Sequence, residues 1–260
     1  MPRTRIDTLL AERGLARSRA SAAESVRAGR VRVGRDGSAA AKPSDLVADD
    51  AELVVVEPPP FVSRGGVKLA NALDALDVEV AGRECLDAGA STGGFTDCLL
   101  QAGAARVIAL DVGHGQLDWS LRSDERVSVI ERTNARNLEP SVLPFRPQLA
   151  TVDVSFIALV QVLPAVIACL AEDADLLALV KPQFELSRGR VGRGGVVRDP
   201  ADRREALRGA ATAATDAGLA VRGLASSGLP GPKGNRETFV WASTSGDSID
   251  LETAIAEADA

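Results

Sequence analysis

Apolar residues recur at helical spacing twice near the start of the chain. The segments 6–10 and 18–27 each place apolar side chains on one face of a helix. Residues 31–33 alternate apolar and polar side chains, and residues 51–57 contain a run of apolar β-branched residues, so both predict strands. Together these elements predict a small α+β domain over residues 1–57.

Three consecutive prolines, Pro58 to Pro60, follow this small domain. A proline run excludes helix and favours an extended, fairly stiff backbone. We therefore expect a connector over residues 58–66 and a larger domain over residues 67–260. A chain of 260 residues is long enough for one full-sized domain with a small one attached.

From residue 83 onward, strand patterns alternate with helical patterns. Helices are expected to begin near Phe95, Phe156 and Arg203, and the expected strands are 84–88, 106–111, 127–130, 149–154, 175–181, 219–225 and 238–242. This alternation predicts an α/β, Rossmann-like architecture, a mostly parallel sheet with helices on both faces. Residues 226–237 carry no helical pattern, so one antiparallel strand is expected near the sheet edge.

Charge is distributed unevenly along the chain. All 260 residues together carry 30 basic and 36 acidic side chains, a net charge of −6. Residues 1–35 contain nine arginines and three acidic residues, which gives +6 and leaves −12 for the remaining 225 residues. The sequence therefore predicts a basic small domain attached to an acidic large one.

Cysteine and histidine usage argues against two kinds of site. The single histidine, His114, and the three scattered cysteines, Cys85, Cys98 and Cys169, form no CxxC pair or cluster, so neither zinc nor disulfides are expected. No stretch approaches the length of an apolar membrane span, and the N-terminus does not resemble a signal peptide. We expect a cytoplasmic protein with no metal and no membrane contact.

A glycine-rich segment follows the first expected strand of the large domain. Residues 87–96 read Asp-Ala-Gly-Ala-Ser-Thr-Gly-Gly-Phe-Thr, which predicts a strand end, a tight turn and a helix start. The next strand ends in Asp111, whose carboxylate suits the hydroxyls of a ribose. The segment lacks the glycine spacing of dinucleotide-binding and phosphate-binding loops and suits S-adenosylmethionine. The alternative is a turn without a ligand, capped by Ser91 or Thr92.

Four charged residues stand beside apolar strand patterns far apart in the sequence: Lys68, Asp153, Lys181 and Glu237. Strand ends converge on one edge of such a sheet, so we expect these side chains to meet there. Lysines held close together disfavour each other's charge, and a neutral amine accepts a proton from a weakly acidic hydroxyl. The alternative is that each residue acts by itself, as an exposed charge, a helix cap or half of an ion pair.

Nine short motifs span nearly the whole chain. They are Arg5–Asp7, Gly14–Arg19, Gly29–Val31, Val62–Leu69, Ala90–Asp97, Leu110–Leu117, Asp153–Ile157, Val180–Glu185 and Gly234–Glu237. Together they resemble the TlyA, or hemolysin A, family. Its members join an S4-like RNA-binding domain to an FtsJ-like ribose 2′-O-methyltransferase domain.

The resemblance implies a methyltransferase variant of the Rossmann-like fold and S-adenosylmethionine as methyl donor. It implies a catalytic Lys-Asp-Lys-Glu tetrad of Lys68, Asp153, Lys181 and Glu237. It implies cofactor contacts from Asp87, Gly89, Ser91, Thr92, Gly93, Gly94, Phe95, Asp111, Val112, Asn134 and Asp153. The arginines expected to bind RNA are Arg3, Arg5, Arg13, Arg17, Arg19, Arg27, Arg30 and Arg64.

The implied reaction is methylation of the 2′-hydroxyl of cytidine in 16S or 23S ribosomal RNA, or in both. The expected partner is ribosomal RNA within ribosomal subunits, and the expected oligomeric state is a monomer. Two alternatives stay open: a noncatalytic RNA-binding or ribosome assembly factor, and a membrane-active hemolysin, although no amphipathic or spanning segment supports the latter.

Two further segments have two interpretations each. The segment Ser187–Arg198, with four arginines and four glycines, either closes over substrate RNA or is a surface loop. Lys233, in a Gly-Pro-Lys-Gly turn, is either a surface charge or a neighbour of the substrate. His114 is interpreted as a turn or cofactor-pocket residue rather than a catalyst.

Overall fold

A computed structural model describes residues 2–34, 37–40, 42–56, 59–192 and 194–258. The chain divides into two compact units, Met1–Pro59 and Pro60–Ala260, and each is described by itself. Glu57 of an expected strand and Pro58 of the expected connector lie outside the described residues.

The first unit is a small α+β domain built around a core of its own. Its elements are β1 (Arg3–Arg5), α1 (Ile6–Glu12), α2 (Arg19–Arg27), β2 (Val31–Val33), β3 (Ser38–Ala39), β4 (Leu46–Ala48) and β5 (Leu53–Val55). Strand β1 pairs antiparallel with β4, and β2 lies between β3 and β5. Ile6 and Leu10 of α1 are fully buried against Val26 of α2 and Val31. This burial confirms the two helices that the apolar spacing predicts.

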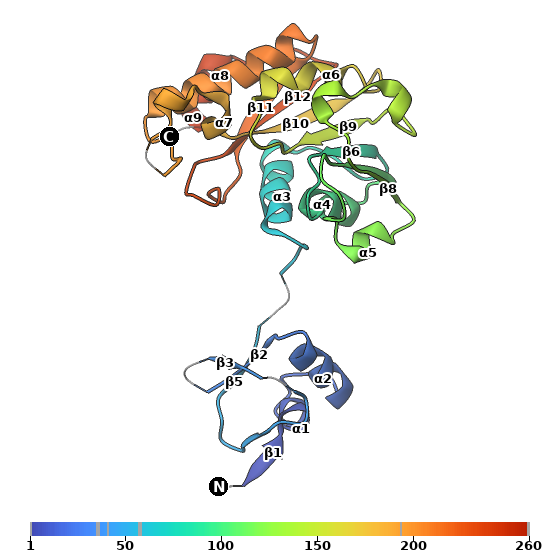
Figure 1. Cartoon of the computed structure of the whole chain (residues 1–260), viewed down its shortest axis with the longest axis vertical. Helices are drawn as coiled ribbons and strands as arrows, with labels where there is room; N and C mark the ends of the chain where they lie inside the picture. The colour runs from blue at the N-terminus through green and yellow to red at the C-terminus, as the bar shows by residue number, and fades with distance from the viewer. Residues whose placement is uncertain (1, 35–36, 41, 57–58, 193, 259–260) are drawn as a thin grey trace. The chain divides into compact units, whose positions relative to one another are not determined.

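The second unit contains a seven-stranded sheet (Figure 1). Its elements are α3 (Arg64–Leu76), β6 (Glu84–Ala88), α4 (Gly94–Gln101), β7 (Arg106–Leu110), α5 (Trp119–Arg122), β8 (Val127–Ile130), η1 (Ala135–Asn137), η2 (Pro140–Val142), β9 (Leu149–Val152), η3 (Leu159–Gln161), α6 (Leu163–Ile167), β10 (Asp175–Val180), α7 (Pro182–Glu185), η4 (Arg188–Arg190), α8 (Pro200–Asp216), β11 (Ala220–Ser226), β12 (Thr238–Ser243) and α9 (Leu251–Ala258). The strand order is β11-β12-β10-β9-β6-β7-β8, and β12 runs antiparallel to both of its neighbours. The α/β prediction, including one antiparallel strand near the edge, is confirmed.

Helices cover both faces of this sheet because neighbouring residues of each strand point to opposite sides. On one face, Leu177 and Leu179 of β10 pack with residues of α3, α4 and α5. On the other face, Leu176 and Ala178 pack with residues of α6, α8 and α9 (Figure 1). The continuous apolar run of β10 is therefore the pattern of a strand buried on both sides.

Helix α3 corrects the expected connector. Residues 64–66, assigned to the connector, form the first turn of α3, and Ser63 caps this helix by accepting a hydrogen bond from the Gly65 amide at 3.3 Å. A glycine pair such as 65–66 is typical of a loop, so the sequence alone predicts a connector there. A β-carbon at Gly66 would lie 2.3 Å from the Phe61 ring, so close packing requires glycine there.

The helix expected to begin at Phe156 begins later. Phe156 is 90% exposed with a φ of 65°, and the helical segments that follow are η3 and α6. A positive φ is incompatible with a helical turn, so Phe156 belongs to the loop after β9. Pro164, at the start of α6, sits where a helix tolerates proline.

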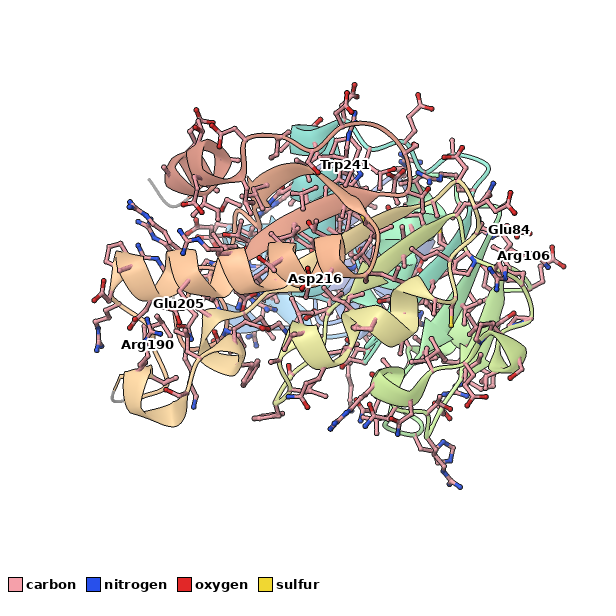
Figure 2. All side chains as sticks on the ribbon, turned by 90° about the horizontal axis from the view of Figure 1, so that it is seen from above. Glu84, Arg106, Arg190, Glu205, Asp216 and Trp241 are labelled. Carbon is pink, nitrogen blue, oxygen red and sulfur yellow. The ribbon has the colours of Figure 1, made fainter. Side chains whose placement is uncertain are left out.

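Ion pairs join segments of the second unit at its surface (Figure 2). Arg106 of β7 donates to Glu84 of β6 at 2.7 Å, near the amino ends of these parallel strands. Arg190 of η4 donates to Asp202 of α8 at 2.8 Å and also pairs with Glu205. These contacts tie the first part of the segment Ser187–Arg198 to α8.

Candidate active site

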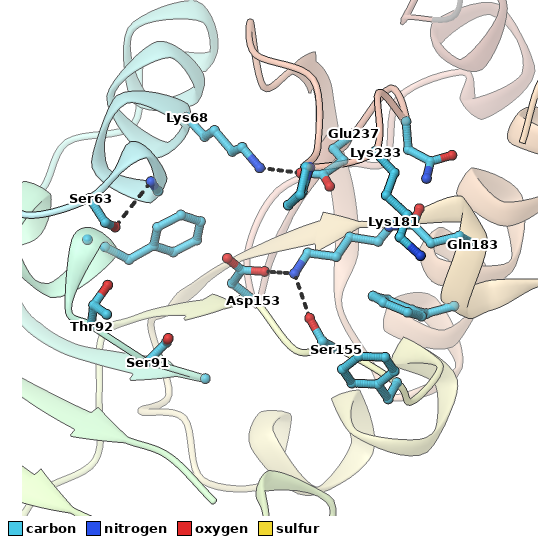
Figure 3. Close-up of a pocket in the computed structure, with 18 of the residues that line it drawn as sticks. Ser63, Lys68, Ser91, Thr92, Asp153, Ser155, Lys181, Gln183, Lys233 and Glu237 are labelled. Atoms are coloured by element: carbon cyan, nitrogen blue, oxygen red, sulfur yellow. Dashed lines mark hydrogen bonds and ion pairs between the residues drawn. The ribbon is translucent and has the colours of Figure 1, made fainter. Parts of the chain in front are cut away.

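The four residues of the expected tetrad come together at one edge of the sheet (Figure 3). Asp153 follows β9 and Lys181 follows β10, so both stand at carboxyl ends of parallel strands. Glu237 precedes β12, whose antiparallel direction brings its beginning to the same edge. Lys68 reaches the edge from the first turns of α3. All four line a cavity of about 510 Å³, called the tetrad cavity below.

Each lysine of the tetrad cavity has a carboxylate partner. Lys68 Nζ lies 2.5 Å from Glu237 Oε2, and the side chains of Lys68 and Glu237 are 10% and 1% exposed. Lys181 Nζ pairs with Asp153 and donates to the Ser155 hydroxyl at 3.1 Å. Burial of ions is tolerated only when they are paired in this way.

A second cavity, of about 670 Å³, adjoins the tetrad cavity. Asp111, Val112 and Asn134 line it near the carboxyl ends of β7 and β8. The residues that line both cavities are Gly89, Ser91, Asp153, Ser155 and Phe156. The two spaces therefore meet at Asp153. Such a joined space fits a nucleoside that carries an amino-acid side arm. The nucleoside then lies in the adjoining cavity and the side arm extends into the tetrad cavity.

The Asp111 carboxylate shapes the adjoining cavity. One oxygen accepts a hydrogen bond from the Ser91 amide at 2.8 Å, and the other accepts from the Gly113 amide at 2.6 Å. These contacts fasten the glycine-rich loop to the turn after β7. Each carboxylate oxygen keeps a second lone pair, so the group is still able to accept from ribose hydroxyls.

Two expected cofactor residues line neither cavity. Asp87 is fully buried beneath the loop, where one oxygen accepts from the Thr96 amide at 2.9 Å and the Thr96 hydroxyl at 2.8 Å. Burial raises the pKa of Asp87 to about 7. Gly93 has a φ of 99°, and a β-carbon there would lie 2.3 Å from Leu121 Cδ1. Both residues hold the shape of the loop from behind. The loop residues that line the cavities are Gly89, Ser91, Thr92, Gly94 and Phe95.

Several cavity residues are absent from the sequence predictions. Phe156 projects beside Phe184, with ring centroids 5.0 Å apart, and both line the tetrad cavity. An exposed bulky residue with positive φ marks backbone strain of the kind found at functional sites. Gln183 also lines the tetrad cavity, and its buried side-chain oxygen has no hydrogen-bond partner among the described residues. Their signal in the sequence is their place in the motifs Asp153–Ile157 and Val180–Glu185, beside Asp153 and Lys181.

Asn235 joins two loops around the tetrad cavity. Its side chain is buried, accepts from the Val197 amide at 2.9 Å and donates to the Gly195 carbonyl at 2.8 Å. Gly195 and Val191 line the tetrad cavity. Part of the segment Ser187–Arg198 is therefore a wall of this cavity. Whether this segment closes over substrate RNA stays a prediction.

The arginines expected to bind RNA lie mostly on the surface of the first unit. Arg3, Arg17 and Arg27 are exposed and have no ion-pair or hydrogen-bond partner in the described part of the chain. Arg5 and Arg19 both pair with buried Asp7, and the hydrogen bond from Arg5 lowers the pKa of Asp7 to about 2.

The three remaining arginines make hydrogen bonds within their own unit. Arg13 donates to the Ala51 carbonyl at 2.6 Å, and Arg30 donates to the Ser25 hydroxyl at 3.3 Å. In the second unit, Arg64 is exposed and donates to the Pro230 carbonyl at 2.9 Å.

Other residue types with possible chemistry lie apart from these cavities. Among the described residues, no group of three or more His, Cys, Asp or Glu side chains is able to hold a metal ion. Cys85, Cys98 and Cys169 are free and buried. His114 lines neither cavity, and its Nδ1 lies 2.5 Å from Glu131. Within the described ranges, no helix is both long and apolar enough to cross a membrane.

Comparison with known proteins agrees with both units. The family model for FtsJ-like methyltransferases matches residues 61–244, and the S4 domain model matches residues 4–53. A Mycobacterium tuberculosis protein named 16S/23S rRNA (cytidine-2'-O)-methyltransferase TlyA is 53% identical over 94% of this chain and 91% of its own length. Hemolysin A of Brachyspira hyodysenteriae is 38% identical over 90% of this chain and 97% of its own length. A solved structure from Streptococcus thermophilus, 39% identical, has a TM-score of 0.73 and covers 99% of this chain and 96% of its own.

The fold and the matched models define an S4 domain followed by a Rossmann-like, FtsJ-like methyltransferase domain. The protein is therefore a methyltransferase, and S-adenosylmethionine is the methyl donor of this class. Within the class, the chain belongs to the TlyA, or hemolysin A, family. The resemblance drawn from the sequence motifs is confirmed.

Proposed function

We propose that the protein methylates the 2′-hydroxyl of a cytidine in ribosomal RNA, in the small subunit, the large subunit or both. The observation that carries this proposal is the tetrad cavity. It holds two lysine–carboxylate pairs and meets the adjoining cavity at Asp153. The reaction named for the Mycobacterium tuberculosis relative supports the choice of nucleotide.

The roles of the four tetrad residues follow from their contacts. When bound, S-adenosylmethionine supplies a methyl group on a positively charged sulfur. The 2′-hydroxyl oxygen attacks this methyl group in line, the sulfur–methyl bond breaks, and the hydroxyl proton passes to Nζ of Lys181, which accepts it in its neutral amine form. Asp153 and Ser155 orient Lys181, to which both are bound. Glu237 keeps Lys68 in place as a second cation at the same cavity.

The tetrad cavity also suits a nucleobase. A target ribose in structured RNA is reached by unstacking its base, and unstacked bases are held by aromatic side chains and by hydrogen bonds to their edges. Phe156 and Phe184 provide an aromatic wall. The buried oxygen of Gln183, without a partner among the described residues, offers an unused acceptor.

The first unit supplies the long-range attraction to RNA in this proposal. The side chains of Arg3, Arg17 and Arg27 have no partner among the described residues and are available to contact phosphates, so binding should weaken as salt rises. A ribosomal substrate implies a cytoplasmic enzyme, and residues of one chain line both cavities. We therefore propose that it acts in the cytoplasm as a monomer.

The test is transfer of labelled methyl groups from S-adenosylmethionine to separated ribosomal subunits. We expect ribose label with the wild type, and a loss of at least a hundredfold with Lys181→Ala, whose folding is checked by its melting temperature. Mass spectrometry of nuclease digests then names the nucleotide.

Two results contradict the proposal. Label on a base contradicts the ribose reaction. Subunits that bind the protein tightly yet take up no label indicate a noncatalytic assembly factor instead. Dye release from liposomes, measured with the same preparation, tests the activity that the name of the Brachyspira hyodysenteriae relative states.

A further inference from the structure

Three of the four lysines in the chain line the tetrad cavity. Lys68 and Lys181 are each matched by a carboxylate, Glu237 and Asp153 respectively. Lys233 is exposed and has no ion-pair or hydrogen-bond partner among the described residues. Among the described residues, the lining of the cavity therefore carries one positive charge that no carboxylate balances. An unbalanced cation at a substrate cavity indicates an anionic group on the substrate.

The turn that carries Lys233 is held in place from both ends. The Gly234 amide donates to the Gly231 carbonyl at 2.8 Å, and the Gly231 amide donates to the Asn235 carbonyl at 2.9 Å. The Lys233 side chain packs along Gly195, where an added β-carbon would lie 3.3 Å from both Cδ and Nζ of the lysine. Asn235, which binds the Gly195 carbonyl, secures this surface. The lysine is thus directed along the cavity wall rather than left free in solvent (Figure 3).

We propose that Lys233 binds the phosphate on the 3′-oxygen of the nucleotide that is methylated. This inference rests on the proposed function. The 3′-oxygen is attached to the carbon next to the one that bears the 2′-hydroxyl. When the hydroxyl lies at Lys181, its neighbouring phosphate therefore lies at the same cavity. Lysine binds phosphate as a compact point charge and needs no fixed bidentate geometry.

The carboxylate of the cofactor is the other anion expected at this site, because the amino-acid arm of S-adenosylmethionine extends from the adjoining cavity into the tetrad cavity. Lys233 lines the tetrad cavity and does not line the adjoining cavity, where Asp111 and Asn134 stand. The two cavities meet at Gly89, Ser91 and Asp153, on other loops of the sheet edge. The affinity for S-adenosylmethionine is therefore a direct check on the assignment.

The experiment compares wild type, Lys233→Gln and Lys233→Arg in methyl transfer to purified ribosomal subunits at several salt concentrations. For Lys233→Gln we expect roughly a tenfold rise in KM for the subunit, the typical value of one hydrogen bond to a charged group. The slope of log affinity against log salt should become shallower by about 0.7 to 0.9, as for one lost phosphate contact. Lys233→Arg should bring both the KM for the subunit and the salt slope most of the way back to their wild-type values. The Kd for S-adenosylmethionine should stay within twofold of wild type.

The matched control is Arg126→Gln, which also removes one positive charge. Arg126 is exposed, precedes β8 at the amino ends of the parallel strands, and pairs only with Asp124 of its own turn in the described structure. The Arg126→Gln variant should leave the KM for the subunit and the salt slope unchanged. An unchanged KM and salt slope in Lys233→Gln, with an active wild type, overturns the assignment and leaves the proposed function intact. Weaker S-adenosylmethionine binding in Lys233→Gln assigns the lysine to the cofactor and also overturns its assignment to the phosphate. An inactive wild type overturns both proposals.

Discussion

The ion pair of Lys68 and Glu237 allows a prediction in which a second substitution restores stability without restoring activity. Glu237→Gln keeps the size of the side chain but removes the charge that balances Lys68. The Glu237 side chain is 1% exposed and that of Lys68 is 10% exposed, so the variant leaves a cation in a nearly water-free position. Removing one partner of a buried pair costs about 3 to 5 kcal/mol. We take about 3 kcal/mol here because Lys68 borders the open tetrad cavity.

This loss should appear as a lower melting temperature of the methyltransferase domain. For a domain of this size, about 3 kcal/mol corresponds to a decrease of roughly 6 to 12 °C. The double variant Lys68→Met/Glu237→Leu replaces both charges by apolar groups and should regain most of the stability, because no unpaired ion is left. Methyl transfer should be lost in both variants.

The control variant is Glu252→Gln, which breaks the exposed pair between α8 and α9. It should leave the melting temperature and the activity at wild-type values, because exposed ion pairs contribute little. The reasoning is refuted if Glu237→Gln melts within 2 °C of wild type, or if the double variant is less stable than Glu237→Gln.

Three further predictions concern the glycine-rich loop and the wall of the tetrad cavity. Gly93→Ala should weaken S-adenosylmethionine binding at least tenfold, because the new β-carbon meets Leu121 at a position with positive φ; calorimetry that finds wild-type affinity would contradict this. Asp87→Asn should gain stability relative to wild type as pH rises from about 4 to about 7, and the difference should stay constant at higher pH. The sign follows because burial raises the pKa of Asp87 to about 7. Between about pH 4 and pH 7 the folded wild type therefore holds a proton that the unfolded chain has released, so the stability of wild type falls as pH rises. A pH-independent difference in denaturant unfolding would refute it. Asn235→Ala should raise the KM for ribosomal subunits and lower the unfolding free energy by about 1 to 3 kcal/mol, because two backbone groups lose their partner. The affinity for S-adenosylmethionine should not change, and a selective loss of that affinity would show that the loop serves the cofactor instead.

The order of elements and the residues at the sheet edge could be predicted from the sequence. Each central strand is a short apolar run buried on both faces, and its end is marked by a polar residue such as Asp111 or Lys181. Strand ends of a parallel sheet share one edge, so polar residues far apart in the sequence are expected together on local patterns alone. The missing helix after residue 226 likewise predicts the antiparallel strand β12.

Which charged residues pair, and where their side chains point, depends in contrast on tertiary contacts. The sequence places two lysines and two carboxylates at one edge, but only the packing of α3 against the sheet pairs Lys68 with Glu237 and leaves Lys181 to Asp153. Contacts with Thr96 hold Asp87 beneath the loop, and Lys233 lies against Gly195 at the cavity. Local patterns report which residues are apolar and where the backbone turns. Which charges meet, and which one stays unpaired, is decided by contacts between segments distant in the sequence, because burial and charge balance belong to the folded structure as a whole.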